Sequence, residues 1–232
     1  MKNFTLSQEW RQALYMRYPH SKIYSTKNID IVDRDDFFEC KQLFDYYISE
    51  KDIAVLKKLL EKKDIKFKYI DKCSPTLSFL YKHLGSDFII DEESNWNNPI
   101  LNLKKNMLAS YLSSRRENMQ RNYKSYLKNK HLLIFKNNKT ENILSLWKDV
   151  LEIDQNCWKE DEGSDMMSLE YEHLQYIFFC MKNPNNYFLN ISYNEDEMPI
   201  GYSLLLKNEN VYYAAKWGAT TNGRKYYIRG YG

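Results

Sequence analysis

The sequence contains few residues that break regular structure and no long apolar segment. Only 7 of its 232 residues are glycine and 5 are proline, and no low-complexity linker divides the chain. No run approaches the roughly 18 consecutive apolar residues of a membrane-spanning helix, and the first residues lack the apolar core of a signal peptide. These absences predict a soluble, cytoplasmic protein.

Cysteine and histidine are also sparse. The cysteines at 40, 73, 157 and 180 are widely spaced without a Cys-x-x-Cys pair, and the 4 histidines are equally scattered. We therefore expect no metal centre, and we expect the cysteines to be reduced and mainly structural. The formal net charge of +3 gives no global attraction to nucleic acid or to a membrane.

The composition favours a globular protein of mixed α/β class. Apolar residues make up 43% and aromatic residues 16% of the chain, which is long enough to bury the core of one large or two small domains. Helical spacing alternates with β-prone runs in the first hundred residues, which indicates an N-terminal α/β domain, assigned to residues 1–108. There we predict helices over residues 7–18, 35–49, 52–63 and 76–84, extended chain over 20–32, and strands over 66–70 and 88–90.

The second domain, assigned to residues 109–232, has a different order of elements. A long helix over residues 101–130 leads into it, followed by a strand over 132–135 and helices over 141–155 and 168–181. Three β-prone runs at 187–193, 200–206 and 211–217 then favour an antiparallel meander, because short polar turns separate them. The last residues, Arg229-Gly230-Tyr231-Gly232, would let backbone N–H groups approach an anion, or would form an ordinary turn.

One face of the predicted helix over 101–130 is basic. Arg121, Lys124 and Lys128 share a helical stripe that is separate from the apolar one. Such a stripe attracts the phosphates of a cofactor, of a nucleotide-linked substrate or of a tRNA end. A solvated helix face without any ligand gives the same pattern.

Four short motifs follow one another in the second half of the sequence. They are Tyr111-Leu112-Ser113-Ser114-Arg115-Arg116 with Asn118 and Arg121, Cys157-Trp158-Lys159 with Gly163, Pro199-Ile200-Gly201, and Arg229-Gly230-Tyr231-Gly232. The last resembles the pyrophosphate-binding loop of the GNAT acyltransferases. The first three, in this order, resemble the FemAB-like branch of that family, which includes the BioF2-like (CelD-like) acetyltransferases. Two positions depart from that branch: Cys157 replaces a serine, and residues 227–230 stand where the branch has Tyr-Ser-Pro-Gly.

The resemblance implies a GNAT-like fold, with a mixed, mostly antiparallel sheet flanked by helices and two related lobes. The family has a helix and further strands after its phosphate-binding loop. We therefore expect the second lobe to be incomplete and the chain to be a fragment.

The resemblance also implies acyl transfer from an acyl-CoA, such as acetyl-CoA, to an amine or hydroxyl by direct attack in a ternary complex, without a metal. Glu160 and Glu162 are the candidate general bases, although acidic loops are also commonly just solvated. The implied cofactor contacts are Tyr213, Ala214, Ala215, Arg229, Gly230 and Gly232, and the implied contacts to a small amine or sugar-linked acceptor are Arg116, Arg121, Trp158 and Lys159. Packing in the core or wall is the alternative role for the tryptophan, and a plain surface position is the alternative for the lysine.

Two further functions remain open from the sequence. Some relatives in this branch use an aminoacyl-tRNA as donor, and the basic helix suits that partner. Alternatively, the chain is a non-catalytic interaction domain that retains the fold without the cofactor loop.

Overall fold

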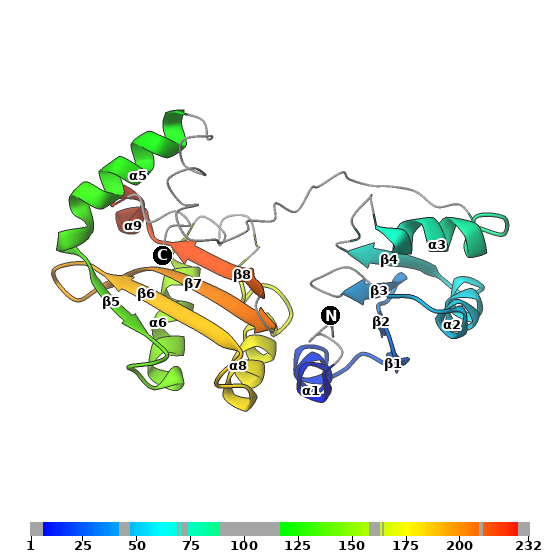
Figure 1. Cartoon of the computed structure of the whole chain (residues 1–232). Helices are drawn as coiled ribbons and strands as arrows, with labels where there is room; N and C mark the ends of the chain where they lie inside the picture. Colours follow the sequence, from blue (N-terminus) through cyan, green and yellow to red (C-terminus); the bar gives the residue numbers. More distant parts are fainter. Residues whose placement is uncertain are drawn as a thin grey trace. The chain divides into compact units, whose positions relative to one another are not determined.

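The structure is a computed structural model in which residues 7–41, 47–68, 70, 74–88, 117–157, 163, 165–208 and 211–226 are described. The chain divides into two compact units, Met1–Ile100 (unit 1) and Leu101–Gly232 (unit 2). Within its described residues each unit contains one four-stranded sheet, and helices pack on both sheets (Figure 1). The mixed class of helices and sheets expected from the sequence is confirmed.

Unit 1 combines an antiparallel ribbon with one parallel strand. The first three strands pair antiparallel in sequence order, and the fourth pairs parallel with the third after the chain returns through a helix. Its elements are α1 (Gln8–Arg17), β1 (Ile23–Ser25), β2 (Asp30–Asp33), β3 (Phe37–Lys41), α2 (Glu50–Leu60), β4 (Asp64–Lys68) and α3 (Pro75–Leu84).

Two helices of unit 1 begin where the capping residues predict. The Ser7 hydroxyl accepts a hydrogen bond from the Trp10 N–H at 3.2 Å, and the Ser74 hydroxyl accepts one from the Thr76 N–H at 3.0 Å. Each bond satisfies a backbone donor that has no partner inside the helix. Pro75 follows Ser74 in the first turn of α3, where a missing N–H costs nothing.

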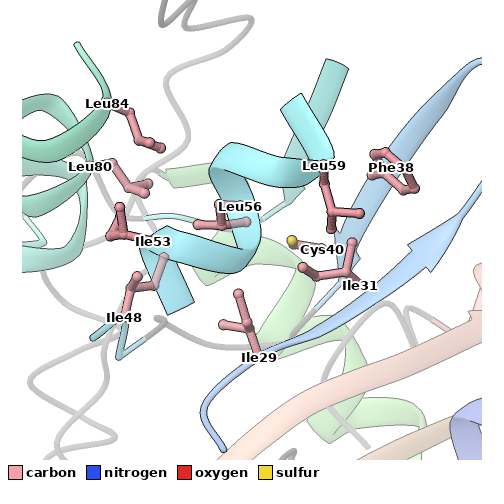
Figure 2. Packing of buried hydrophobic residues seen from close by; sticks show 10 residues of the cluster. All are labelled: Ile29, Ile31, Phe38, Cys40, Ile48, Ile53, Leu56, Leu59, Leu80 and Leu84. Carbon is pink, nitrogen blue, oxygen red and sulfur yellow. The ribbon is translucent and has the colours of Figure 1, made fainter. Parts of the chain in front are cut away.

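The core of unit 1 forms where α2 and α3 meet the sheet. Ile53, Leu56 and Leu59 lie on one face of α2 because they are three residues apart, and all three are buried. Figure 2 shows them among the side chains of α3 and of the strands. The cluster is completed by Ile29, Ile31, Phe38, Cys40, Ile48, Leu80 and Leu84.

The helix predicted over residues 35–49 is wrong. Residues 37–41 form β3, which lies between β2 and β4 and pairs with both. Phe38 and Cys40 are two residues apart, so in a strand their side chains point to the same face of the sheet. Both are buried on the core side. The strand predicted over 88–90 is not found at Phe88, which follows α3 and donates its N–H to the Leu84 carbonyl, while residues 89–90 lie outside the described part.

Unit 2 contains a wholly antiparallel sheet in the order β5-β6-β7-β8. Helix α6 contacts β6, β7, β8 and α8, so it covers one face of this sheet (Figure 1). The elements are α5 (Glu117–Asn129), a 3-10 turn η2 (Lys130–Leu132), β5 (Ile134–Asn137), α6 (Ile143–Gln155), α8 (Glu172–Lys182), β6 (Tyr187–Tyr193), β7 (Pro199–Asn208), β8 (Val211–Ala219) and α9 (Thr221–Lys225).

The meander predicted from the three apolar runs is confirmed, and β6 has the predicted bounds. Several other boundaries differ from the predicted ones. Helix α8 begins at Glu172 rather than at 168, because Tyr171 adopts a left-handed backbone with φ 56° that ends the preceding turn. Strand β5 begins two residues late, after η2, and a short helix, α9, replaces the loop expected directly after β8.

The helix predicted over residues 101–130 is found from Glu117 to Asn129, and residues 101–116 lie outside the described part. Among the described residues, none of the helices is both long and apolar enough to cross a bilayer.

Replacing Leu56 with alanine tests the core of unit 1. Leu56 is fully buried at the centre of α2, so we expect the change to lower the free energy of unfolding by about 2–5 kcal/mol. Lys58→Ala is the matched control on the same helix, because Lys58 is exposed, and we expect its effect to stay within about 0.5 kcal/mol. Urea denaturation followed by circular dichroism measures both, and equal effects would contradict this packing.

Candidate functional site

The pairing of β7 with β8 is interrupted by one extra residue. Leu204 pairs with Lys216 and Leu205 pairs with Ala214, so Ala215 has no partner residue on β7. This is a β-bulge, in which two residues of one strand oppose one residue of its neighbour. Bulges are common beside active sites because they redirect backbone groups and side chains.

The bulge shifts the alternation of side chains along β8. Before it, Tyr212 and Ala214 are exposed, and after it Trp217 is exposed. An uninterrupted strand would instead place residues 212, 214, 216 and 218 on one face. The extra residue therefore brings Lys216 and Gly218 to the face of the sheet that α6 covers.

Lys216 forms a buried ion pair on that covered face. Its ammonium contacts the carboxylate of Glu172, in the first turn of α8, and the two side chains are 17% and 5% exposed. Removing two charges from water is costly, and close pairing of opposite charges offsets that cost. The pair connects α8 to β8 at the residue that follows the bulge.

A second buried polar contact lies beside the first. Asp154, near the end of α6, is fully buried and accepts hydrogen bonds from the Tyr202 hydroxyl at 2.6 Å and from the Met166 N–H at 2.5 Å. Burial, together with the neighbouring Asp154 carboxylate, holds the pKa of Tyr202 well above its ordinary value. The phenol therefore stays protonated and keeps donating to Asp154.

The space around Gly218 is too small for a side chain. Gly218 pairs with Tyr202 across the strands, and a Cβ atom at residue 218 would lie 2.7 Å from the Tyr202 ring. Real Cβ atoms essentially never approach another heavy atom so closely. The Tyr202 ring thus fills the space above Gly218 and reaches Asp154.

Helix α9 packs directly against the start of β7. The Thr220 hydroxyl caps it by accepting a hydrogen bond from the Gly223 N–H at 3.1 Å. A Cβ atom at Gly223 would lie 2.0 Å from the Ile200 carbonyl oxygen, so only glycine fits. Thr220 also forms an isolated antiparallel bridge with Cys157, which holds the end of α6 next to the end of β8.

Three of the predicted cofactor-binding residues lie on β8 at or next to the bulge: Tyr213, Ala214 and Ala215. Among the predicted substrate-binding residues, Arg121 lies exposed on α5. The remaining predicted site residues, Arg116, Trp158, Lys159, Glu160, Glu162, Arg229, Gly230 and Gly232, lie outside the described part of the chain.

The basic stripe predicted on α5 is exposed. Arg121, Lys124 and Lys128 all face solvent within their unit, whereas Tyr126 packs on Leu133 and Ile200. In the described ranges none of these three cations forms an ion pair. By contrast, Lys57 near the end of α2 pairs with Asp87 at 2.6 Å.

The sequence did not point to Asp154 and Glu172, although a signal existed. Asp154 is four residues after Val150 and seven after Trp147, so it lies on the apolar face of α6. Glu172 is likewise four residues before Tyr176 on α8. A carboxylate on an apolar stripe indicates a buried partner. Lys216 had no such signal, because strict alternation places it with Tyr212 and Ala214.

No protein-family model and no curated protein matches the chain. Solved structures do share its fold. A conserved protein of unknown function from Bacteroides thetaiotaomicron VPI-5482 aligns with a TM-score of 0.58 and 13% identity over 95% of this chain and 73% of that chain. L-PGS from Bacillus licheniformis aligns with a TM-score of 0.51 and 9% identity over 92% of this chain and 66% of that chain.

A third structure is the C-terminal domain (DUF2156) of a protein described as a lysylphosphatidylglycerol synthetase, from Agrobacterium fabrum. It aligns with a TM-score of 0.49 and 9% identity over 96% of this chain and 68% of that chain, a likeness too weak to support an inference. At these identities the first two structures establish a shared fold and nothing finer.

Replacing Tyr202 with phenylalanine tests the buried contact beside the bulge. The change removes the donor to one oxygen of the fully buried Asp154 carboxylate, so we expect the free energy of unfolding to fall by about 1–3 kcal/mol. Tyr212→Phe is the matched control on β8, since Tyr212 is 49% exposed and should tolerate the change within about 0.5 kcal/mol. Thermal unfolding of the two variants compares them, and a neutral Tyr202→Phe would rule out a stabilising role for this hydrogen bond.

Proposed function

We propose that this chain is an acyl-group transferase with a GNAT-like fold whose donor is an aminoacyl-tRNA. In this proposal the aminoacyl group passes to an amine or hydroxyl acceptor, and the transferase lobe spans residues 109–232. The observation that carries it is the bulge at Ala215 in β8, which is the last strand of the antiparallel sheet among the described residues. A backbone group outside the ladder is available to bind a donor carbonyl.

The proposed reaction is a direct displacement at the ester of the donor. The acceptor nitrogen or oxygen attacks the carbonyl carbon, and the carbonyl oxygen gains negative charge that backbone N–H groups near Ala214 and Ala215 stabilise. The bond to the tRNA oxygen then breaks, and that oxygen leaves with the proton that the acceptor lost. Glu160 and Glu162 remain the candidate bases for moving this proton. Arg116, Arg121, Trp158 and Lys159 remain the candidate contacts to the acceptor.

Two observations favour an aminoacyl-tRNA as the donor. The first is the fold, which is shared with L-PGS from Bacillus licheniformis. The second is the group of exposed cations on α5, which form no ion pair within the described residues. They suit an RNA backbone, because Lys and Arg side chains bind phosphates by neutralising their charge and releasing counterions.

An acyl-CoA is the second candidate donor. The bulge would suit a thioester carbonyl as well as an ester, and the proposed contacts of the cofactor are then Tyr213, Ala214 and Ala215 with Arg229, Gly230 and Gly232. Acetyl-CoA is the simplest such donor, and no metal takes part in either scheme. The two donors differ in size and charge, so binding experiments separate them.

A binding panel tests the choice of donor. We expect charged tRNA to bind the chain with an affinity that falls steeply as salt rises, and CoA and acetyl-CoA to leave the melting temperature unchanged. Filter binding and thermal shift measure the two effects, and release of a radiolabelled aminoacyl group from its tRNA to hydroxylamine, a simple acceptor, follows transfer. A thermal shift with acetyl-CoA but no tRNA binding would select the acyl-CoA scheme. If the chain binds neither tRNA nor acetyl-CoA, both donor schemes are rejected and the hypothesis of a non-catalytic interaction domain remains.

Charge removal on α5 tests its part in tRNA binding. For Lys124→Gln with Lys128→Gln we expect weaker tRNA binding, and a plot of log affinity against log salt whose slope falls by about two, one for each lost phosphate contact. Lys51→Gln with Lys58→Gln removes the same charge from exposed positions on α2 and is the matched control. Equal slopes for the two double variants would show that α5 does not contact the tRNA.

A further inference from the structure

We infer that the buried ion pair between Glu172 and Lys216 fixes the register of β8 and thereby positions the bulge at Ala215. The pair joins the first turn of α8 to the residue after the bulge. Both residues act on the backbone of Ala215 rather than on a substrate, so they are positioning residues. We call this fixing of the pairing between β7 and β8 the register lock. Its effect on the rate of group transfer rests on the proposed function, whereas the register lock itself does not.

The register lock becomes clear when the observed pairing of β7 with β8 is compared with a pairing that has no bulge. If Ala215 took its place opposite Leu204, every later residue of β8 would move back by one position along β7. A one-residue slip turns each side chain to the other face of the sheet. Lys216 would then point away from α8, and the buried Glu172 carboxylate would face the methyl group of Ala215. Losing the opposite charge of Lys216 would be strongly unfavourable for the buried carboxylate.

The space around Gly218 opposes the same slip independently. In the straight register Trp217 would replace Gly218 opposite Tyr202, where even a Cβ atom would lie 2.7 Å from the Tyr202 ring. Trp217 is 38% exposed on the other face in the observed register. Two independent effects therefore favour the bulged pairing over the straight one: the ion pair of Lys216 and the lack of room for a side chain at position 218.

A bulge held in this way has a defined use in the proposed reaction. Donor groups stabilise a developing charge best when they are already oriented before the donor binds. The ion pair lies on the face of the sheet that α6 covers. It can therefore fix the position of β8 without obstructing the edge of β8 that faces away from β7, where a ligand would bind. Loss of the pair should then reduce the rate of transfer more than it weakens binding of the donor.

Amide hydrogen exchange on the full chain without any donor tests the lock directly. For Lys216→Met and for Glu172→Gln we expect exchange in residues 211–219 to quicken by about tenfold or more, while β6 changes little. Lys216→Arg keeps the cation and should restore slow exchange. Lys182→Met, at the exposed end of α8, is the matched control and should leave both strands unchanged.

Unchanged exchange of β8 in both disrupting variants would overturn the inference, and so would equal acceleration of β6 and β8, which indicates general loosening. In a transfer assay the disrupting variants should lower kcat with little change in KM, and Lys216→Arg should recover it. If the wild-type chain transfers no group from any donor while β8 exchange responds as expected, the proposed function fails and the register lock stands.

Discussion

The arrangement of β8 in unit 2 depends on one constraint, the burial of the ion pair between Glu172 and Lys216 beside the bulge. A lysine and a glutamate are largely removed from water between α8 and β8, and the charge of each stabilises the other. That requirement admits one register for the end of β8. The neighbouring contact from Tyr202 to Asp154 fastens β7 to α6 in the same layer. Polar contacts therefore join the sheet to its helices near the bulge, and the Tyr193 hydroxyl of β6 adds another by donating to Asp149 of α6.

Much of the fold could be predicted from local signals. The three strands of the meander were recognisable because each is an apolar run between polar turns, and α1 and α3 were recognisable because Ser7 and Ser74 are good caps. β3 was missed, since pairing with two neighbouring strands outweighed a helical spacing of apolar residues. Long-range pairing of that kind leaves little trace in a short window of sequence.

The candidate site was less predictable than the fold. Motif likeness led to Ala214 and Ala215, and the structure independently places an irregularity there, but the bulge itself could not be foreseen. It exists because Lys216 finds Glu172 and because Gly218 has no room for a side chain, and both causes come from residues distant in sequence. An exposed cationic stripe is simpler to predict, since helical spacing alone defines it.

The crowding at Gly218 and Gly223 also bears on how this sequence can change over time. The chain is rich in lysine, asparagine and tyrosine and has only 7 glycines. At these two positions a neighbouring ring and a neighbouring carbonyl leave no volume even for a methyl group. A side chain at either position would therefore clash with its surroundings, and we expect relatives with very different compositions to share these two glycines.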